Sequence, residues 1–408
     1  MLIVQKYGGS SVANAERIFN VASRIAENYD KGHSMVVILS AQGDTTDELI
    51  EKAIEINPSA SRREMDMLLS TGEQQSVALM AMALEKMGYR AISLNALQVG
   101  IDTTSMHSNA KIKTVSRGRI EQELERKNIV IITGFQGVNK FEDITTLGRG
   151  GSDTSAVAIA AALRADKCEI YTDVAGVYTA DPRIVKDARK LDEISYDEMA
   201  ELASLGAKVL HTRSVEVAQK YNVEIVVRSS LTKEEGTVVK GETSVEKMLV
   251  SGVASDKDIA RIAIEGIPDE PGKAFEVFSI LDKKNVSVDI IIQSIGRDKT
   301  NDISFTVAKD ELAEAISVLE ENKESFGARK ITFDDTVAKV SIVGAGMATH
   351  PGVAKLMFEA LYDANVNIQM ISTSEIKISV LISQKDVENA LVAIHDKFNL
   401  ATQSLRKD

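Results

Sequence analysis

The chain has 408 residues, 44% hydrophobic and 26% charged, which is the composition of an ordinary folded protein of two or three domains. Its net charge of -12 argues against a surface for nucleic acid or an anionic membrane, because both need a concentrated basic patch. The single cysteine, Cys168, excludes an intramolecular disulfide and a multi-thiolate metal site, and the apolar run beside it predicts a core position.

The N-terminal residues, 1–9, form a short apolar run with no long hydrophobic stretch behind it. We therefore expect no signal peptide and no membrane span, and a cytoplasmic protein. The five histidines show no metal-ligand spacing, so they are expected in loops or in hydrogen-bonded positions rather than around a metal.

The first predicted strand, residues 2–5, runs into a glycine turn, Lys6–Ser11, and then into a helical pattern over 15–28. Such a corner at the carboxyl end of a strand is where open α/β sheets turn backbone N–H groups towards a phosphate. Lys6 adds a point charge there. The corner lacks the Gly-Lys-Ser/Thr ending of a Walker A loop, so it is a weak signal alone.

A second buried strand is predicted at 35–39, followed by a polar turn at 40–46 and a helix to about residue 56. The next helical region, 63–87, is expected to be interrupted near Ser70–Glu73. Glu73 has two interpretations: an acid of a helix first turn, favoured by the helix dipole, or a holder of a ligand ammonium.

Further apolar runs at 91–94, 129–132 and 169–172 alternate with helical patterns at 119–127 and 154–165. Continuous apolar strands that alternate with helices predict a parallel sheet covered on both faces.

A second glycine-rich corner, Thr146–Ala156, carries Arg149 and Asp153 into a helix N-terminus. Free N–H groups, the positive end of the helix dipole and a guanidinium all favour an anion there. The alternative is a plain turn whose helix is capped by Asp153 or Thr154.

The loop at 172–183 combines a proline-fixed turn with an aromatic suited to a nucleotide. Helices are predicted at 197–205 and 212–221, and a last strand at 224–228. The polar, glycine-bearing segment 232–243 has the character of a domain boundary.

The rest of the chain is an internal repeat. Pro271-Gly272 aligns with Pro351-Gly352 and, without a gap, Asn285-Val286 falls on Asn365-Val366. Each copy predicts a βαββαβ unit, and pairing two such units side by side would bury their sheet edges.

Residues 340–347 imitate a dinucleotide fingerprint within the second copy. Thr349 stands where the third glycine belongs, and the segment is the first strand of a repeat too small for a dinucleotide fold. We expect no nicotinamide site.

Phosphoryl transfer is the reaction that these motifs indicate. They are three corners on one predicted sheet, at 6–11, 40–46 and 146–153, and the nucleotide-type loop at 172–183. Positioning and charge neutralisation supply most of the catalysis in such reactions.

These motifs resemble those of the aspartate kinases (aspartokinases), within the amino-acid kinase fold. Residues 173–183 and 206–210 add to the resemblance, which covers essentially the whole chain because aspartokinases of this kind end in two ACT domains. The matching motifs are Lys6–Ser11, Ser70–Glu73, Gly134–Gly137 and Thr146–Asp153.

The resemblance implies a three-layer, mostly parallel α/β kinase domain over residues 1–240. A linker and the first ferredoxin-like ACT domain would occupy 241–336, and the second ACT domain 337–408.

The implied reaction transfers the γ-phosphoryl group of ATP to the side-chain carboxylate of L-aspartate. It gives 4-phospho-L-aspartate, the first step towards lysine, threonine and methionine. That carboxylate is already ionised at neutral pH, so no general base is needed. Mg²⁺ is expected to arrive with ATP rather than on protein side chains.

By similarity, Lys6 contacts the transferring phosphate, Arg149 binds the α-carboxylate of aspartate, and Glu73 holds its ammonium. Asp153 would orient Lys6, touch the ammonium or merely cap the helix. The acceptor pocket would be completed by Ser40, Thr46, Phe135, Gly150, Gly151 and Ser152. The expected nucleotide-binding residues are Lys6, Tyr7, Gly8, Gly9, Ser10, Thr172, Asp173, Tyr178, Thr179, Ala180, Asp181, Pro182, Arg183 and Lys208.

The ACT repeats imply inhibition by lysine, threonine or both, and a homo-oligomer formed through these domains; the alternative is a dimerisation module without a ligand. Some relatives also make a separate short regulatory chain, which would start near Met248. The expected effector-binding residues are Asp269, Pro271, Gly272, Lys273, Ala274, Ser287, Val288, Asp289, Gln293, Val353, Ala354, Asn367, Ile368, Ser374 and Glu375.

Two other functions remain open from the sequence. One is another amino-acid kinase, of the glutamate or acetylglutamate type, because the fold and the first glycine corner are shared. The other is a non-catalytic amino-acid sensor, against which the intact Lys6, Arg149 and Asp153 argue.

Overall fold

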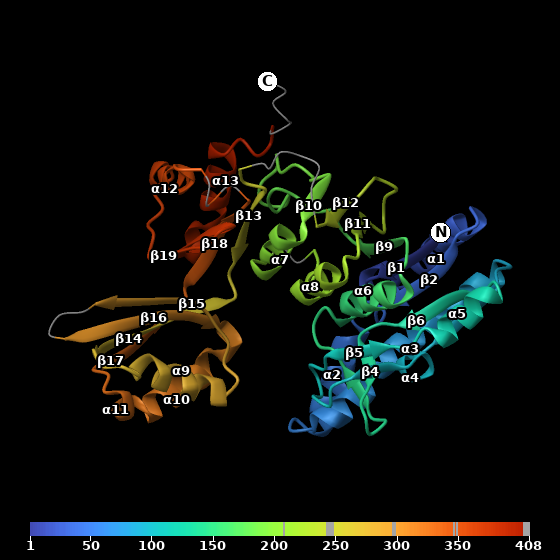
Figure 1. Ribbon diagram of the computed structural model, residues 1–408, viewed down its shortest axis with the longest axis horizontal. Helices are drawn as coiled ribbons and strands as arrows, with labels where there is room; N and C mark the ends of the chain where they lie inside the picture. The colour runs from blue at the N-terminus through green and yellow to red at the C-terminus, as the bar shows by residue number, and fades with distance from the viewer. Residues whose placement is uncertain (207–208, 242–248, 296–298, 346, 348–349, 403–408) are drawn as a thin grey trace. The chain divides into compact units, whose positions relative to one another are not determined.

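The computed structural model describes residues 1–206, 209–241, 249–295, 299–345, 347 and 350–402 (Figure 1). The chain divides into two compact units. We call the first, Met1–Tyr178 with Lys190–Glu246, the kinase unit, and the second, Thr179–Arg189 with Lys247–Asp408, the ACT unit. No described helix is both long enough and apolar enough to cross a membrane.

An eight-stranded sheet forms the centre of the kinase unit. Its strands are β1 (Leu2–Tyr7), β2 (Ser34–Leu39), β3 (Ala91–Leu94), β6 (Ile129–Thr133), β9 (Lys167–Thr172), β10 (Glu193–Ser195), β11 (Ile225–Ser229) and β12 (Thr237–Lys240). They lie in the order β10-β12-β11-β9-β1-β2-β6-β3. The strands from β11 to β3 are parallel, which confirms the prediction, whereas β12 runs antiparallel to β11.

Helices cover both faces of this sheet because its central strands are apolar on both sides (Figure 1). Ile3, Val37 and Ile131 pack in one core with α1 (Ala15–Asp30) and α3 (Arg62–Lys86). The alternate residues, such as Val4 and Val36, are equally buried and face the other side. There α6 (Gly151–Leu163) contacts β1, β2 and β9 and packs on α8 (Thr212–Tyr221). The remaining helices are α2 (Thr45–Ile56), α4 (Ala96–Val99), α5 (Gly118–Glu125) and α7 (Tyr196–Ser204).

The interruption expected near Ser70–Glu73 is wrong, because α3 is continuous through it. A helix tolerates one glycine at a cost of about 1 kcal/mol, and Gly72 has a packing reason. A Cβ at Gly72 would lie 2.8 Å from the Cβ of Ala41, so only glycine lets α3 approach the end of β2 this closely.

A small four-stranded sheet was not predicted. It has the order β5-β4-β7-β8, formed by Ile112–Val115, Ile101–Thr103, Gln136–Val138 and Ile144–Thr146. Three of these strands have only three residues and the fourth has four, which is too short for a periodic pattern to emerge. This sheet carries the chain from β6 to the glycine corner before α6.

The first ACT sheet has the predicted βαββαβ chain order. Its elements are β14 (Ile259–Pro268), α9 (Lys273–Lys283), β15 (Val288–Ile295), β16 (Thr300–Ala308), α10 (Leu312–Glu321), α11 (Lys323–Phe326) and β17 (Lys330–Asp334). The strands lie in the order β15-β16-β14-β17.

The second ACT sheet departs from the predicted order at its last strand. Its own elements are β18 (Val337–Val343), α12 (Val353–Asp363), β19 (Met370–Thr373), β20 (Lys377–Ser383) and α13 (Val387–Lys397). The place of the fourth strand is taken by β13 (Gly252–Asp256), which pairs antiparallel with β18. Residues 252–256, expected in the linker and first ACT domain, therefore complete the second. The imitation of a dinucleotide fingerprint starts inside β18, as expected, while Thr349 lies outside the described residues.

A segment of the predicted nucleotide loop, Thr179–Arg189, also belongs to the ACT unit. Ala180 and Val185 lie in the apolar core of the second ACT domain. The Oγ1 of Thr179 is 3.0 Å from the Nε2 of His395 on α13, and its carbonyl accepts a hydrogen bond from the backbone N–H of Val253. Residues 1–240, expected as one kinase domain, thus contribute one segment to the second unit.

Candidate active site

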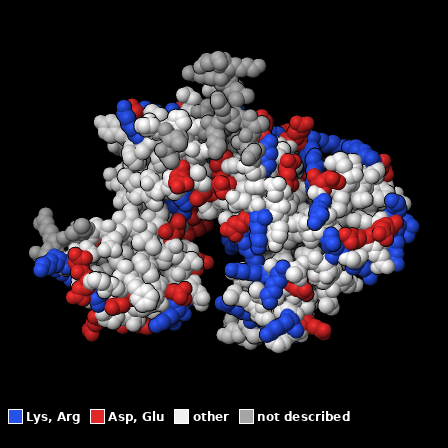
Figure 2. Space-filling view, in the orientation of Figure 1, with Lys and Arg blue, Asp and Glu red and all other residues white. Residues whose placement is uncertain are grey.

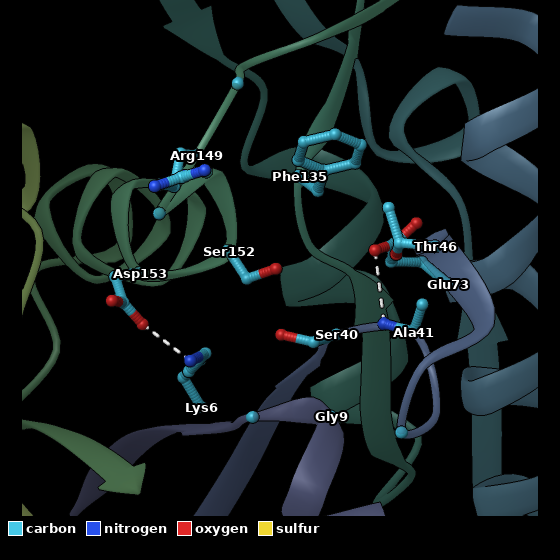
Figure 3. A pocket seen from close by; sticks show the side chains of 15 residues that line it. Lys6, Gly9, Ser40, Ala41, Thr46, Glu73, Phe135, Arg149, Ser152 and Asp153 are labelled. Carbon is cyan, nitrogen blue, oxygen red and sulfur yellow. Dashed lines mark hydrogen bonds and ion pairs between the residues drawn. The ribbon is translucent and has the colours of Figure 1, made fainter. Parts of the chain in front are cut away.

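The carboxyl ends of β1, β2 and β6 border a pocket of about 300 Å³ (Figure 3). Every residue predicted for the acceptor pocket lines it, together with Lys6, Gly8 and Gly9 from the first corner. The lining residues are Lys6, Gly8, Gly9, Ser40, Ala41, Gly43, Thr46, Glu73, Phe135, Gly148, Arg149, Gly150, Gly151, Ser152 and Asp153. The parallel strand order explains why the turns after β1, β2 and β6 meet, because turns after neighbouring strands share one sheet edge. Helix α3 brings Glu73 to this edge, and the loop between β8 and α6 brings Arg149.

Lys6 and Asp153 form an ion pair at one end of the pocket, with 2.7 Å between Nζ and Oδ1 (Figure 3). Helix α6 begins at Gly151, one turn earlier than predicted, so Asp153 lies in its first turn. No side chain caps this helix, which removes capping by Asp153 or Thr154 from the alternatives. The carboxylate instead holds the Lys6 ammonium at the helix N-terminus, where backbone N–H groups and the helix dipole attract anions.

The first two corners are locked together behind the pocket. A Cβ at Gly9 would lie 2.6 Å from the carbonyl oxygen of Ala41, and the carbonyl of Gly9 accepts a hydrogen bond from the N–H of Gly43. Glycine at this position therefore brings the turn after β1 against the turn after β2. The hydroxyls of Ser40 and Ser152 point into the space between these corners and α6 (Figure 3).

Glu73 lies at the other end of the pocket and is 3% exposed. Its Oε1 accepts a hydrogen bond of 3.1 Å from the backbone N–H of Ala41, whereas Oε2 has no hydrogen-bond partner. Burial raises the pKa of Glu73 to about 7, while the hydrogen bond from Ala41 opposes the shift. A buried carboxylate with one unpaired oxygen is costly unless a donor or cation arrives from the pocket.

Arg149 and Glu73 lie on different sides of the pocket (Figure 3). The Arg149 side chain is exposed, and its guanidinium makes no hydrogen bond or ion pair to the part of the chain that the structure describes. Phe135, between them in the view, has a φ of 68°. A bulky residue in this left-handed region stores strain of about 1–3 kcal/mol, as residues at functional sites often do.

Two neighbours of the pocket were missed by sequence reasoning. Ala41 offers only its backbone N–H, which no motif reveals. His211, at the start of α8, packs against Gly150, and burial lowers the pKa of its imidazole. The sequence gives no reason to separate His211 from the other histidines, because its sequence neighbours do not indicate the contact with Gly150.

The expected nucleotide residues do not all share the pocket. Tyr7 is fully buried, stacks on Tyr171 and donates its hydroxyl hydrogen to Gln5, so only its backbone remains for a ligand. Ser10 is exposed at the corner. Thr172, Asp173 and Tyr178 belong to the kinase unit, while Thr179, Ala180, Asp181, Pro182 and Arg183 belong to the ACT unit. Lys208 lies outside the described residues.

Within the ACT-unit part of this loop, Thr179 and Ala180 have buried side chains, so only their backbone remains for a nucleoside. Asp181 and Arg183 form an ion pair at 2.7 Å, and the hydrogen bond from Arg183 lowers the pKa of Asp181.

The expected effector residues fall on both ACT sheets. Gly272 and Gly352, the two Pro-Gly glycines, precede α9 and α12 with φ of 97° and 104°, and no side chain caps either helix. Asp269 accepts a hydrogen bond from Asn301, and Asp289 is paired with Lys339. Lys273, Ala274, Val288, Gln293, Val353 and Ala354 lie on strands or helices of the two ACT domains. The turns and loops between these elements hold Pro271, Ser287, Asn367, Ile368, Ser374 and Glu375.

In the described residues, no group of three or more His, Cys, Asp or Glu side chains is arranged to hold a metal ion. Acidic side chains lie among the basic ones on the face shown in Figure 2.

Comparison with known proteins gives one consistent result. Residues 1–229 match the amino acid kinase family, and residues 262–322 and 340–398 match the ACT domain. The aspartokinase of Mycolicibacterium smegmatis is 50% identical over 405 residues, which is 98% of this chain and 96% of that relative. Aspartokinase 2 of Bacillus subtilis is 50% identical over 401 residues, with 98% of each chain covered.

Among solved structures, the chain is similar to aspartokinase III of E. coli in complex with aspartate and ADP, with a TM-score of 0.81 and 26% identity. The match covers 97% of this chain and 99% of that one. The complex of aspartokinase III with lysine and aspartate gives a TM-score of 0.76 at 27% identity, with the same coverage.

Proposed function

We propose how individual residues act in this chain, which belongs to the aspartokinases. These are ATP-dependent members of the amino acid kinase family with ACT domains. The chain transfers a phosphoryl group from ATP to L-aspartate in amino-acid biosynthesis. Relatives of this name match over nearly its full length, which decides against a glutamate or acetylglutamate kinase and against a non-catalytic sensor.

The acceptor end of the pocket binds the amino-acid group of L-aspartate. Glu73 takes the ammonium on its unpaired Oε2, and Arg149 takes the α-carboxylate with its planar fork. The observation that carries this assignment is the unpaired buried oxygen of Glu73, together with the burial that raises the pKa of this side chain to about 7. Ser40, Thr46, Phe135 and Ser152 enclose the rest of the substrate.

The donor end receives the γ-phosphoryl group. Lys6 neutralises charge on the transferring phosphate, and Asp153 keeps the Lys6 ammonium aimed into the pocket at 2.7 Å. Gly8 and Gly9 leave room for the phosphates beside the corner, and the N-terminus of α6 adds N–H donors. Aspartate attacks as the carboxylate, so the residues hold two anions together rather than move a proton.

Mg²⁺ is proposed to come with ATP. This ion prefers oxygen ligands and is usually held by one or two carboxylates in addition to substrate phosphates. Asp153, with the hydroxyls of Ser40 and Ser152 nearby, fits such an arrangement. When bound, the ion would shield the phosphate charges. Thr172, Asp173 and Tyr178 remain the proposed contacts of the nucleoside.

The acceptor assignment is tested with Glu73→Gln and Arg149→Ala in steady-state kinetics. Removing one partner of an ion pair that substrate buries costs roughly 2 to 5 kcal/mol, so kcat/KM for aspartate should fall roughly 30-fold or more, with KM for ATP little changed. Arg62→Ala, an exposed arginine at the start of α3, is the matched control. Near-normal kinetics for aspartate in either variant would show that the assignment is wrong.

The ACT unit is proposed to bind lysine, threonine or both as inhibitors. The uncapped N-termini of α9 and α12 offer N–H groups to an effector carboxylate. A titration of each amino acid against activity tests this, and no inhibition by either would refute it. A homo-oligomer through the ACT domains is tested by sedimentation, and a short chain starting near Met248, outside the described residues, by intact mass of the native protein.

A further inference from the structure

A second buried carboxylate stands on α3, seven residues before Glu73. Asp66 has no exposed surface. Its Oδ1 accepts a hydrogen bond of 2.6 Å from the hydroxyl of Thr146, and its Oδ2 accepts one of 3.0 Å from the backbone N–H of Ser108. The Nδ1 of His107 lies 2.8 Å from Oδ2. Residues seven apart share one helix face, so Asp66 and Glu73 point to the same side of α3.

These contacts of Asp66 reach the loop that carries Arg149. Thr146 ends β8, three residues before Arg149, and its carbonyl accepts a hydrogen bond of 2.9 Å from the N–H of Ala110. A Cβ at Gly148 would lie 3.0 Å from the carbonyl oxygen of Ser108, so the two loops touch. Asp66 therefore fixes both the strand end before Arg149 and the loop that packs beside it.

The same loop is held from its other side by Arg213 on α8. Its Nη1 donates a hydrogen bond of 2.7 Å to the carbonyl of Leu147, and its Nη2 donates one of 2.6 Å to the carbonyl of Ala110. Arg149 itself has no hydrogen-bond or ion-pair partner among the described residues, so the backbone of its loop alone sets its place.

We propose that Asp66 is a positioning residue for aspartate binding. It acts through Thr146 and Ser108 and sets the distance between the guanidinium of Arg149 and the carboxylate of Glu73. Helix α3 then holds both ends of the bound amino acid, one through Glu73 directly and the other through Asp66. This inference rests on the proposed role of Arg149. Small displacements of groups that orient a substrate lower rates strongly, so a loosened loop should weaken aspartate binding selectively.

The test compares Thr146→Val, which removes the hydroxyl and keeps the shape, with Thr146→Ser, which keeps the hydroxyl. Loss of a buried hydrogen bond to a charged group should raise KM for aspartate roughly tenfold in Thr146→Val and in Asp66→Asn, with KM for ATP within twofold of wild type. Thr146→Ser should restore aspartate kinetics. Glu64→Gln, at an exposed position of α3 two residues before Asp66, is the control.

Trypsin supplies a readout that does not depend on turnover, because it cleaves after the exposed Arg149. Cleavage there should be several-fold faster in Thr146→Val and Asp66→Asn, at a temperature where both variants remain folded by circular dichroism. If Asp66→Asn fails to fold, Thr146→Val decides alone.

The outcomes separate the two proposals. Wild-type KM for aspartate and wild-type cleavage in Thr146→Val, together with a raised KM in Arg149→Ala, would overturn the role of Asp66 and leave the acceptor site intact. An equal rise of KM for both substrates in Thr146→Val would also overturn it, because a general structural defect acts on both. Wild-type aspartate kinetics in Arg149→Ala would overturn the acceptor site itself.

Discussion

The two ends of the active-site pocket differ in whether their charged side chains already have a partner. At the donor end, Lys6 and Asp153 are already paired at 2.7 Å. At the acceptor end, one oxygen of Glu73 has no hydrogen-bond partner and the pKa of this side chain is raised to about 7. Under the proposed roles, the lysine that meets phosphate is held in place beforehand, whereas the carboxylate that recognises an ammonium is left for the substrate to pair. Recognition of aspartate then completes an interaction that the free protein lacks.

The largest effect is expected from removing the charge at the donor end. In Lys6→Met, kcat should fall roughly 100- to 1000-fold, the range seen for a single group that stabilises transition-state charge. KM for aspartate should stay within about threefold, since the acceptor end is unchanged. Initial rates with both substrates varied measure this.

Lys31→Met, an exposed lysine after α1, serves as the control for the loss of one charge. If Lys6→Met kept a kcat near that of the wild type, or only raised KM for aspartate, the proposed difference between the two ends would be wrong.

The residues of the pocket could be predicted because short-range signals mark them. An apolar strand followed by glycine and hydroxyl residues identifies a corner, and parallel strands bring such corners to one edge, so Lys6 and Arg149 were expected together. Glu73 lies in a predicted helical region, and only the resemblance to the aspartokinases placed it with them. The pairing of Lys6 with Asp153 was one of three alternatives, and only packing decides it.

Features created by long-range packing could not be predicted. The close approach of α3 to the end of β2 depends on Gly72 at the contact with Ala41, and the last strand of the second ACT sheet, β13, comes from before the first repeat. Thr179–Arg189 looks like a surface loop in the sequence, yet Ala180 and Val185 enter an apolar core. In each case the residues that make the decisive contact are far apart in the chain, so a local sequence pattern cannot reveal it.

The stability of the free protein gives a second way to test the acceptor end. The folded-state pKa of Glu73, about 7, lies above its value of 4.5 in the absence of burial. Between these values the unfolded chain loses the proton while the folded chain keeps it, so stability falls as pH rises through this window. The full cost, present above about pH 7, is roughly 3 kcal/mol.

Glu73→Gln removes this cost and should therefore be more stable than the wild type at pH 8, with a melting temperature higher on the order of 5 °C. The difference should shrink towards pH 5, where the wild-type side chain is protonated. Saturating aspartate should also reduce the difference in melting temperature, because the substrate ammonium pairs with the ionised Glu73 of the wild type but not with the neutral glutamine. Thermal unfolding at the two pH values checks this, and a variant that is equally destabilised at both would contradict the buried, unpaired state of Glu73.

The smallest effect is expected in the pH dependence of aspartate binding. Glu73 must be ionised to pair with an ammonium, and with a pKa of about 7 it is mostly ionised at pH 8 and mostly protonated at pH 6. KM for aspartate should therefore rise about tenfold as the pH falls from 8 to 6, over a range in which the aspartate side chain, with a pKa of about 3.9, does not titrate. In Glu73→Gln the profile should be flat at a raised KM. If KM for aspartate changed with pH in the same way in the wild type and in Glu73→Gln, the pH dependence would belong to another group. The proposed difference between the acceptor end and the donor end, an unpaired charge at Glu73, would then be wrong.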